Sequence, residues 1–113
     1  MPYINTTTNV KISDEKREVL KFEYGNAIAM LGKTESWLML NFEDGKEMYF
    51  KGDNSSPMAF VDISVFGHSA DDQCENMTRE ICRILGENLN IAPDKVYVKF
   101  SGTNQWGWNN MVF

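Results

Sequence analysis

The segments AFVDISVF (residues 59–66), CENMTREICRIL (residues 74–85) and VYVKFS (residues 96–101) decide the fold of this chain. Apolar residues occupy every second position of the first and third segments, which predicts two strands with one apolar face each. In the middle segment apolar residues recur at helical spacing, at Cys74, Met77, Ile81, Ile84 and Leu85. Ser69 and Asp72 resemble a capping box before this helix. The three segments therefore predict one β-α-β unit.

A similar unit lies roughly 55 to 58 residues earlier in the chain. Residues 3–10 are rich in β-branched side chains and predict a strand, and Ser13 offers a helix N-cap. Apolar residues then follow a helical stripe that ends at Gly32, at Leu20, Tyr24, Ala27, Ile28 and Leu31. The apolar run 37–42 is typical of a strand buried on both faces. After a turn at residues 43–45, residues 47–51 predict a short hairpin arm.

The order β-α-β-β followed by β-α-β predicts an α+β sandwich. Its simplest form is one mixed four-stranded sheet with both helices on one face. We expect residues 1–113 to form a single domain, because a chain of this size has room for one core. The other sheet face would expose Met39 and Phe60, so we expect another copy of the chain to cover it. A ferredoxin-like domain of unspecified function fits the same pattern.

Composition excludes several classes of function. Sixteen acidic and eleven basic residues give a net charge of −5, which disfavours nucleic acids and anionic membranes as partners. No window approaches the roughly 20 apolar residues of a membrane span, so we expect no membrane insertion. Cys74 and Cys82 would lie about 12 Å apart on one helix, too far for a disulfide. With only His68 besides them, we expect no metal site.

Pro2 is the candidate for chemistry. A proline in this position is common, and by itself it indicates only that Met1 can be removed. Once Met1 is removed, Pro2 becomes a secondary amine, and an unperturbed α-amine titrates near pH ~8. Burial beside another cation would lower this pKa and leave a neutral base at physiological pH. While Met1 is attached, the same nitrogen is an amide and no base.

Several motifs distributed over the whole chain resemble the macrophage migration inhibitory factor family of the tautomerase superfamily. They are Met1-Pro2, Thr8-Asn9-Val10, Leu31-Gly32-Lys33, residues 92–98 (APDKVYV) and residues 106–113 (WGWNNMVF). The resemblance implies the tautomerase fold and a homotrimer with active sites at the subunit boundaries. It also implies that no cofactor takes part.

The activity implied by the resemblance is keto–enol tautomerisation of phenylpyruvate-like 2-keto acids, with dopachrome analogues as model substrates. Pro2 would take a proton from the carbon next to the carbonyl and return it to the other end of the enol. The positions matching the family's substrate-binding residues are Lys33, Trp37, Ser64, Phe66, Tyr97, Lys99, Trp106, Trp108 and Phe113. Lys33 would bind the substrate carboxylate or carbonyl oxygen, although a lysine after a helix also stabilises the helix dipole. Tyr97 would come from the neighbouring subunit.

Some positions depart from the family pattern. Lys99 stands where better-known members carry asparagine, and it either favours carboxylate binding or obstructs a bulky aryl group. Ser64 replaces a histidine and Phe66 a smaller isoleucine, which concerns substrate preference more than reaction type. The family's Cys-x-x-Cys pair is absent, since residues 57–60 are PMAF. Thiol oxidoreductase activity therefore has no residues to carry it.

Two functions of different classes follow from the resemblance. The first is a tautomerase. The alternative is a secreted, cytokine-like protein that binds a cell-surface receptor of its host or of its own source, with weak or no tautomerase activity. Cysteine usage indicates a cytoplasmic protein, and family members are exported without a signal peptide, so secretion without one is the alternative location. Lys11 and Ile12 stand where vertebrate members carry a receptor-binding arginine, which weakens the second function. An assembly domain with neither activity is the third interpretation.

Overall fold

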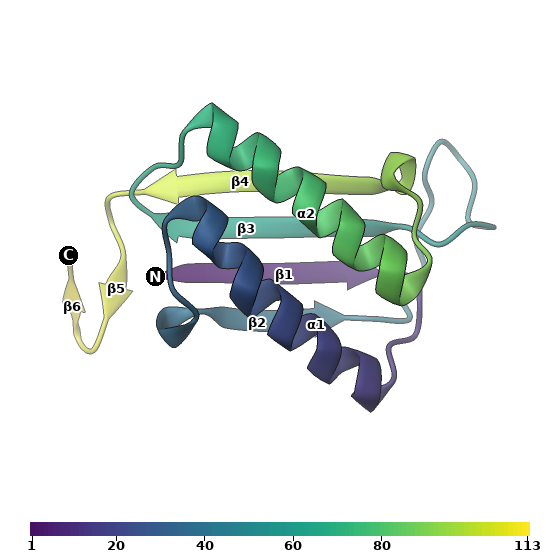
Figure 1. Cartoon of the computed structure of the whole chain (residues 1–113), viewed down its shortest axis with the longest axis horizontal. Helices are drawn as coiled ribbons and strands as arrows, with labels where there is room; N and C mark the ends of the chain where they lie inside the picture. Colours follow the sequence, from purple (N-terminus) through teal and green to yellow (C-terminus); the bar gives the residue numbers. More distant parts are fainter.

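The computed structural model describes all 113 residues, and it shows a four-stranded sheet with two helices across one face (Figure 1). The strands are β1 (Pro2–Thr8), β2 (Met39–Glu43), β3 (Ala59–Phe66) and β4 (Val96–Thr103), and the helices are α1 (Asp14–Ala27) and α2 (Asp71–Leu89). Three short 3₁₀ helices cover Ile28–Leu31, Glu35–Trp37 and Pro93–Lys95. A small hairpin, β5 (Gly107–Trp108) and β6 (Met111–Val112), ends the chain. No helix combines the length and apolar character needed to cross a bilayer.

The sheet has the strand order β2-β1-β3-β4. β1 pairs with β2 in parallel and β3 pairs with β4 in parallel, because each pair is joined through a helix crossover. The two units meet at the antiparallel pair β1–β3. The predicted mixed sheet with both helices on one face is confirmed.

The core lies between the sheet and the two helices. It contains the inward residues of β1 and β3 and the apolar stripes of α1 and α2. Full burial of one such side chain contributes about 1.5–3 kcal/mol to folding. The hydroxyl groups of Thr6 and Tyr24 are buried in this core and share a hydrogen bond of 2.9 Å, so neither is left without a partner.

The ends of the helices were predicted with mixed success. Ser13 is the N-cap of α1, and its Oγ accepts a hydrogen bond from the Lys16 N–H at 3.1 Å. Gly32 ends the following 3₁₀ turn with φ 71°, a conformation that glycine adopts readily. The predicted capping box at Ser69 and Asp72 is wrong. The N-cap of α2 is Ala70, which has no side-chain acceptor, and its own N–H donates to Gln73 Oε1 at 2.9 Å.

Two predictions about the middle of the chain are wrong. The strand expected at residues 37–42 begins only at Met39, and it is not buried on both faces. It is an edge strand with β1 as its one neighbour, and Asn41 and Glu43 alternate with partly buried Leu40 and Phe42. The hairpin arm expected at residues 47–51 is a loop with a single bridge to Asp53. The Phe50 ring packs against Tyr97 of β4, so a side-chain contact holds this segment in place of strand pairing.

The sheet face opposite the helices carries exposed apolar side chains, as predicted. Met39 is 66% exposed, Phe60 36% and Tyr97 59%. Isolated exposed apolar residues are ordinary, but several on one sheet face mark a surface that binds a partner. In one chain nothing covers this face.

Candidate active site around Pro2

The N-terminus, the chain after α1 and the C-terminal hairpin meet at one end of the sheet (Figure 1). A cavity of about 300 Å³ lies there. Its lining residues are Met1, Pro2, Tyr3, Ser36, Trp37, Leu38, Met39, Trp106, Gly107 and Trp108. Pro2 is buried and starts β1, where it pairs with Val65 of β3. The sheet therefore fixes the position of the Pro2 nitrogen at the wall of this cavity.

Lys33 brings a positive charge to the same end of the sheet. Its Nζ donates a hydrogen bond of 3.0 Å to the main-chain oxygen of Phe66, the last residue of β3. The left-handed turn at Gly32 directs the chain away from the preceding 3₁₀ helix and places Lys33 next to β3. Burial, and then the charge of Lys33, lower the pKa of the N-terminal amine on Met1. Lys33 thus acts electrostatically on the start of the chain.

Both main-chain polar groups of Phe66, the N–H and the carbonyl, make hydrogen bonds. Its N–H donates to the carbonyl oxygen of Met1 at 3.2 Å, and its own carbonyl accepts from Lys33. The sequence drew attention to Phe66 but not to Met1 as the partner of its N–H. Only the β1–β3 register could have indicated this pair, because main-chain groups carry no residue-type signature. The bond means that removal of Met1 would free a main-chain donor next to Pro2.

Aromatic side chains surround this end of the sheet. The rings of Trp37 and Trp108 meet edge to face with centroids 5.0 Å apart, and those of Phe66 and Phe113 do so at 5.5 Å. Trp108 also lies 6.3 Å from Phe113. The Phe113 N–H donates to the Trp106 carbonyl at 3.0 Å and closes the hairpin that carries three of these residues. Edge-to-face pairs of this kind add about 0.5–1.5 kcal/mol beyond the area they bury.

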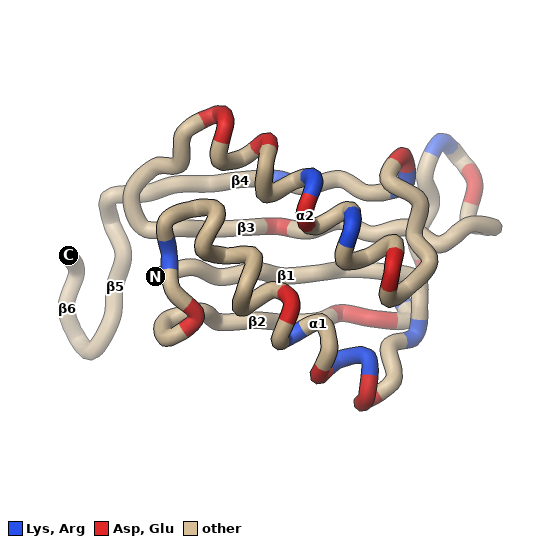
Figure 2. The backbone as a smooth tube through the Cα atoms, in the orientation of Figure 1, with Lys and Arg blue, Asp and Glu red and all other residues tan.

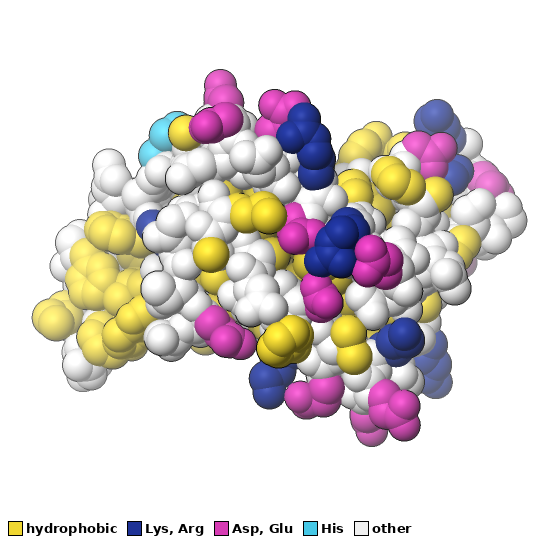
Figure 3. Space-filling view, viewed as in Figure 1, with side chains coloured by type: hydrophobic (Ala, Val, Ile, Leu, Met, Phe, Trp, Pro, Cys, Tyr) yellow, Lys and Arg dark blue, Asp and Glu magenta, His cyan; other side chains and the backbone are white.

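The aromatic cluster is accessible to solvent. Trp37 is 52% exposed, Trp108 44% and Phe113 46%. Figure 3 shows apolar side chains gathered at the end of the molecule that carries β5 and β6, and Figure 2 shows no charged residue on that hairpin. The surface can therefore stack an apolar ring, with Lys33 as the nearby cation.

Ser64 lies at the Pro2 end of the sheet, whereas Tyr97 and Lys99 lie farther along the strands. Ser64 is on the open face, paired with Tyr3 and Ser101. Tyr97 pairs with Phe60, five residues along β3 from the partner of Pro2, so it lies roughly 16 Å from Pro2 along the strand direction. Lys99 also projects from β4 on the open face. One chain alone does not bring Tyr97 or Lys99 to Pro2.

Tyr97 has an ordered aromatic environment of its own. Its ring meets Phe50 edge to face at 5.2 Å and Phe60 at 6.4 Å. The ammonium groups of Lys51 and Lys95 each lie 5.6 Å from the Phe50 ring centroid, within the range of cation–π attraction. Phe50 thus ties the loop between β2 and β3 to Tyr97. No motif in the sequence predicted this contact.

The sequence profile of the family described as Macrophage migration inhibitory factor (MIF) matches residues 1–113. The chain belongs to this family. It is 26% identical over 115 residues to macrophage migration inhibitory factor of Rattus norvegicus and 28% over 116 residues to that of Xenopus laevis. Each alignment covers 100% of this chain and 99% of the relative.

The solved structures agree with this assignment. The crystal structure of Leishmania major MIF2 matches with a TM-score of 0.92 and 31% identity, covering 100% of this chain and 97% of that one. The macrophage migration inhibitory factor homologue of Prochlorococcus marinus matches with a TM-score of 0.85 over 98% of both chains, and its 24% identity shows the fold alone. The fold is therefore that of the macrophage migration inhibitory factor family within the tautomerase superfamily, whose members are generally oligomeric.

Proposed function

We propose that residues 1–113 act as one domain that catalyses cofactor-independent keto–enol tautomerisation of phenylpyruvate-like 2-keto acids, with Pro2 as the base. One observation carries the proposal. Buried Pro2 lies where the cation of Lys33 and the aromatic cluster meet, and a 2-keto acid with a phenyl ring needs both. Membership of the tautomerase superfamily supports isomerase activity. The combination of a cation and aromatic side chains supports 2-keto acids with a phenyl ring as the substrate class.

The basicity of Pro2 follows from its surroundings. The Met1 amine already has a lowered pKa because of burial and the charge of Lys33. After removal of Met1, the Pro2 amine lies one residue deeper and keeps both influences. Both favour the neutral amine, so its lone pair is available for proton transfer at neutral pH.

The chemistry needs a single base that moves one proton. The Pro2 nitrogen takes a proton from the carbon next to the carbonyl. The C–H electron pair becomes the C=C bond, and the carbonyl π pair moves to oxygen. The protonated Pro2 then returns the proton to that oxygen, which completes the enol and regenerates the base. Lys33 stabilises the negative charge that develops on the substrate.

Removal of Met1 has a second effect in this proposal. It frees the Phe66 N–H from the Met1 carbonyl, so that this main-chain donor can hold a substrate oxygen beside Lys33. Trp37, Trp106, Trp108 and Phe113 then form the apolar surface on which the phenyl ring stacks. The main-chain donor does not depend on the identity of side chain 66, so the phenylalanine in place of isoleucine leaves it intact.

We further propose that the working form is a homotrimer in which a neighbouring subunit supplies Tyr97 and Lys99, while Ser64 comes from β3 of the subunit that supplies Pro2. The exposed apolar sheet face and the distance of roughly 16 Å between Tyr97 and Pro2 support this arrangement. Assembly of the trimer would then both cover the exposed sheet face and complete the active site.

A cytokine-like protein that binds a cell-surface receptor, of its host or of its own source, is the second candidate. The relatives are named macrophage migration inhibitory factors, which favours a signalling role. Phe66 also lies against Phe113 at the edge of the cavity, where a bulky ring leaves less room for substrate.

The deciding experiment compares two preparations, one with Met1 removed and one with Met1 retained, as verified by intact mass. Phenylpyruvate tautomerisation is followed by the loss of enol absorbance. We expect turnover only in the processed form. Turnover in both forms would exclude the Pro2 amine as the base. Turnover in neither, with the oligomer intact, would contradict the enzyme and favour the binding protein.

A further inference from the structure

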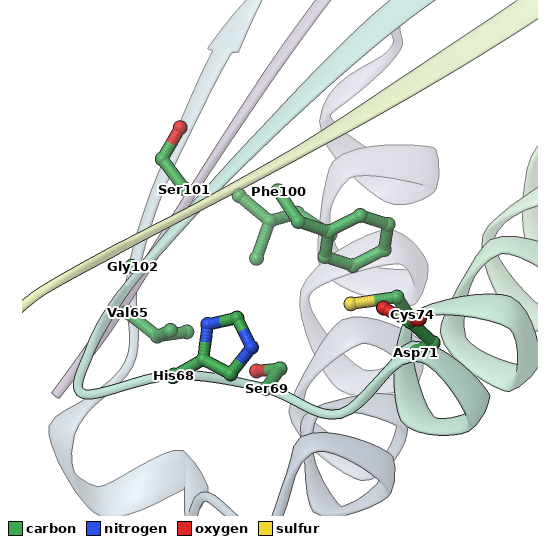
Figure 4. Close-up of a pocket in the computed structure, with 9 residues that line it drawn as sticks. Val65, His68, Ser69, Asp71, Cys74, Phe100, Ser101 and Gly102 are labelled. Carbon is green, nitrogen blue, oxygen red and sulfur yellow. The ribbon is translucent and has the colours of Figure 1, made fainter.

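A second cavity, of about 250 Å³, lies where α2 begins (Figure 4). Ile63, Val65 and Phe100 form its apolar wall, and His68, Ser69 and Cys74 supply polar groups. None of its lining residues lines the cavity at Pro2. It is therefore separate from the proposed tautomerase site.

Local backbone geometry creates this cavity. Gly67 adopts φ 90°, and its N–H donates to the Thr103 carbonyl at 2.7 Å, which holds the loop after β3 against the end of β4. Gly102 permits this approach, because a Cβ there would collide with the Gly67 carbonyl. The chain then enters α2 at Asp71 with the small N-cap residue Ala70, and no large side chain fills the space between.

Ser69 has a free hydroxyl in a buried position. The residue is only 8% exposed, and its hydroxyl makes no hydrogen bond within the chain. Every fully enclosed side-chain polar atom has a partner, so this hydroxyl opens into the cavity. Figure 4 shows it beside the His68 ring, with the Cys74 sulfur directed into the same space. Because this hydroxyl is accessible from the cavity and has no partner in the chain, it can donate to or accept from a molecule that binds there.

The charges around the cavity restrict what can bind. No lysine or arginine lines it, and the carboxylate of Asp71 is the charged group at its rim. Burial, with Asp71 and Asp72 adding to it, raises the pKa of the Cys74 thiol, which therefore stays protonated and acts as a weak donor. Anions are consequently disfavoured here, in contrast to the Pro2 end of the sheet, where Lys33 brings a positive charge.

We propose that this cavity binds a small uncharged ligand with a single ring and one hydroxyl or ring N–H, such as a phenol. The ring packs against Ile63, Val65 and Phe100, and the polar group shares hydrogen bonds with Ser69 and His68. The volume supports a single ring, because pockets for larger ligands span roughly 300–1,000 Å³.

An amide NMR titration of the intact protein tests the ligand class. Phenol is the probe, and benzoate is the matched anion with the same ring. We expect phenol to shift the signals of residues 68–74 and 100–102 with millimolar affinity, and benzoate to leave them unchanged. Phenol shifts confined to the residues around Pro2, or equal shifts with benzoate, would overturn the proposal.

Two serine variants test the hydrogen bond. Ser69→Ala removes the hydroxyl that opens into the cavity, and Ser101→Ala removes one that lines the same site but points away from it (Figure 4). We expect Ser69→Ala to weaken phenol binding about five-fold, the effect of losing one hydrogen bond. Ser101→Ala should bind phenol unchanged. Equal affinities for both variants and the parent chain would contradict the role of Ser69.

Discussion

The two ends of the sheet differ in the chemistry they offer. At one end, buried Pro2 lies near the Lys33 ammonium and an aromatic cluster. At the other, Tyr97 packs against Phe50 and Phe60, beside the ammonium groups of Lys51 and Lys95. The first end holds the groups that the proposed tautomerisation needs, whereas the second presents a phenol hydroxyl on an uncovered surface.

This difference indicates how one small chain could build a complete site. The two ends lie roughly 16 Å apart along the strands, so no rotamer change brings Tyr97 to Pro2 within one subunit. A second copy docked on the open face could place its Tyr97 end against the Pro2 end of the first. Full activity would then depend on assembly, because neither end alone contains all the groups of the proposed site.

Mixing two variants with lowered turnover tests this dependence and has the largest expected effect. Pro2→Gly should lower phenylpyruvate turnover about 10³-fold by removing the secondary amine, and Tyr97→Ala about ten-fold. When the two proteins are unfolded together and reassembled, roughly a quarter of the sites regain both groups if neighbours share a site. Turnover of the mixture should therefore exceed the average of the two separate variants.

The controls for mixing are sedimentation and melting temperature. Each variant should sediment as a trimer of the 13.0 kDa chain and melt like the parent. Turnover in the mixture equal to the average of the separate variants, with trimers intact, would show that Tyr97 acts within its own subunit or not at all. A monomer at low micromolar concentration would contradict the shared site.

The fold was predictable where periodicity was unambiguous. Residues 59–66 and 96–101 carry an apolar residue at every second position, and the helical stripes contain apolar residues at regular spacing, so the β-α-β units follow from sequence. The prediction for residues 37–42 was wrong because six mostly apolar residues are also typical of a strand buried on both faces. In the structure Trp37 belongs to a 3₁₀ helix and joins the aromatic cluster, a use of a large apolar residue that no local pattern reveals.

The site was predictable only in part. Pro2 and Lys33 could be named from the family resemblance, but the bond from Lys33 to a main-chain carbonyl and the role of the Met1 carbonyl depend on strand register. Ser69 shows the opposite error. Its sequence position suggested a helix cap, whereas the cap falls one residue later and leaves the hydroxyl free in the second cavity. The unpredicted main-chain contacts and the wrong cap assignment both depend on tertiary geometry, which short motifs do not encode.

Removing the cation at the Pro2 end should have the next largest effect. Lys33→Met should lower kcat/KM about 30-fold, because a charged hydrogen bond to the substrate is lost. Lys33 also lowers the pKa of the terminal amine, so its removal should raise that pKa. Since the neutral amine is the active form, the rising limb of the pH–rate profile should move to higher pH.

Lys21→Met is the matched control for Lys33→Met, because Lys21 is an exposed cation on α1 whose Nζ pairs with Glu18 at 3.4 Å, away from both ends of the proposed site. It should leave the pH–rate profile where it was. A profile that stays in place for Lys33→Met as well would mean that Lys33 does not influence the base, and that its contact with Phe66 is structural.

The smallest effect is expected at Lys99, the cation that departs from the family pattern. Its Nζ lies 3.9 Å from the Asp62 carboxylate, and both side chains are exposed, so this pair contributes little to stability. The ammonium is thus available to attract a substrate carboxylate from a neighbouring subunit. Lys99→Asn should raise the KM for phenylpyruvate about three-fold at low salt and less at high salt, because ions screen exposed charges.

Lys99→Arg keeps the charge and should retain the parent KM, which separates an electrostatic effect from a change of shape. A lower KM for Lys99→Asn would instead identify Lys99 as an obstruction to the aryl group. An unchanged KM in both variants would place the side chain outside the site. Because Lys99 and Tyr97 project from the same face of β4, this last result would also weaken the assignment of the Tyr97 end to a neighbour's active site.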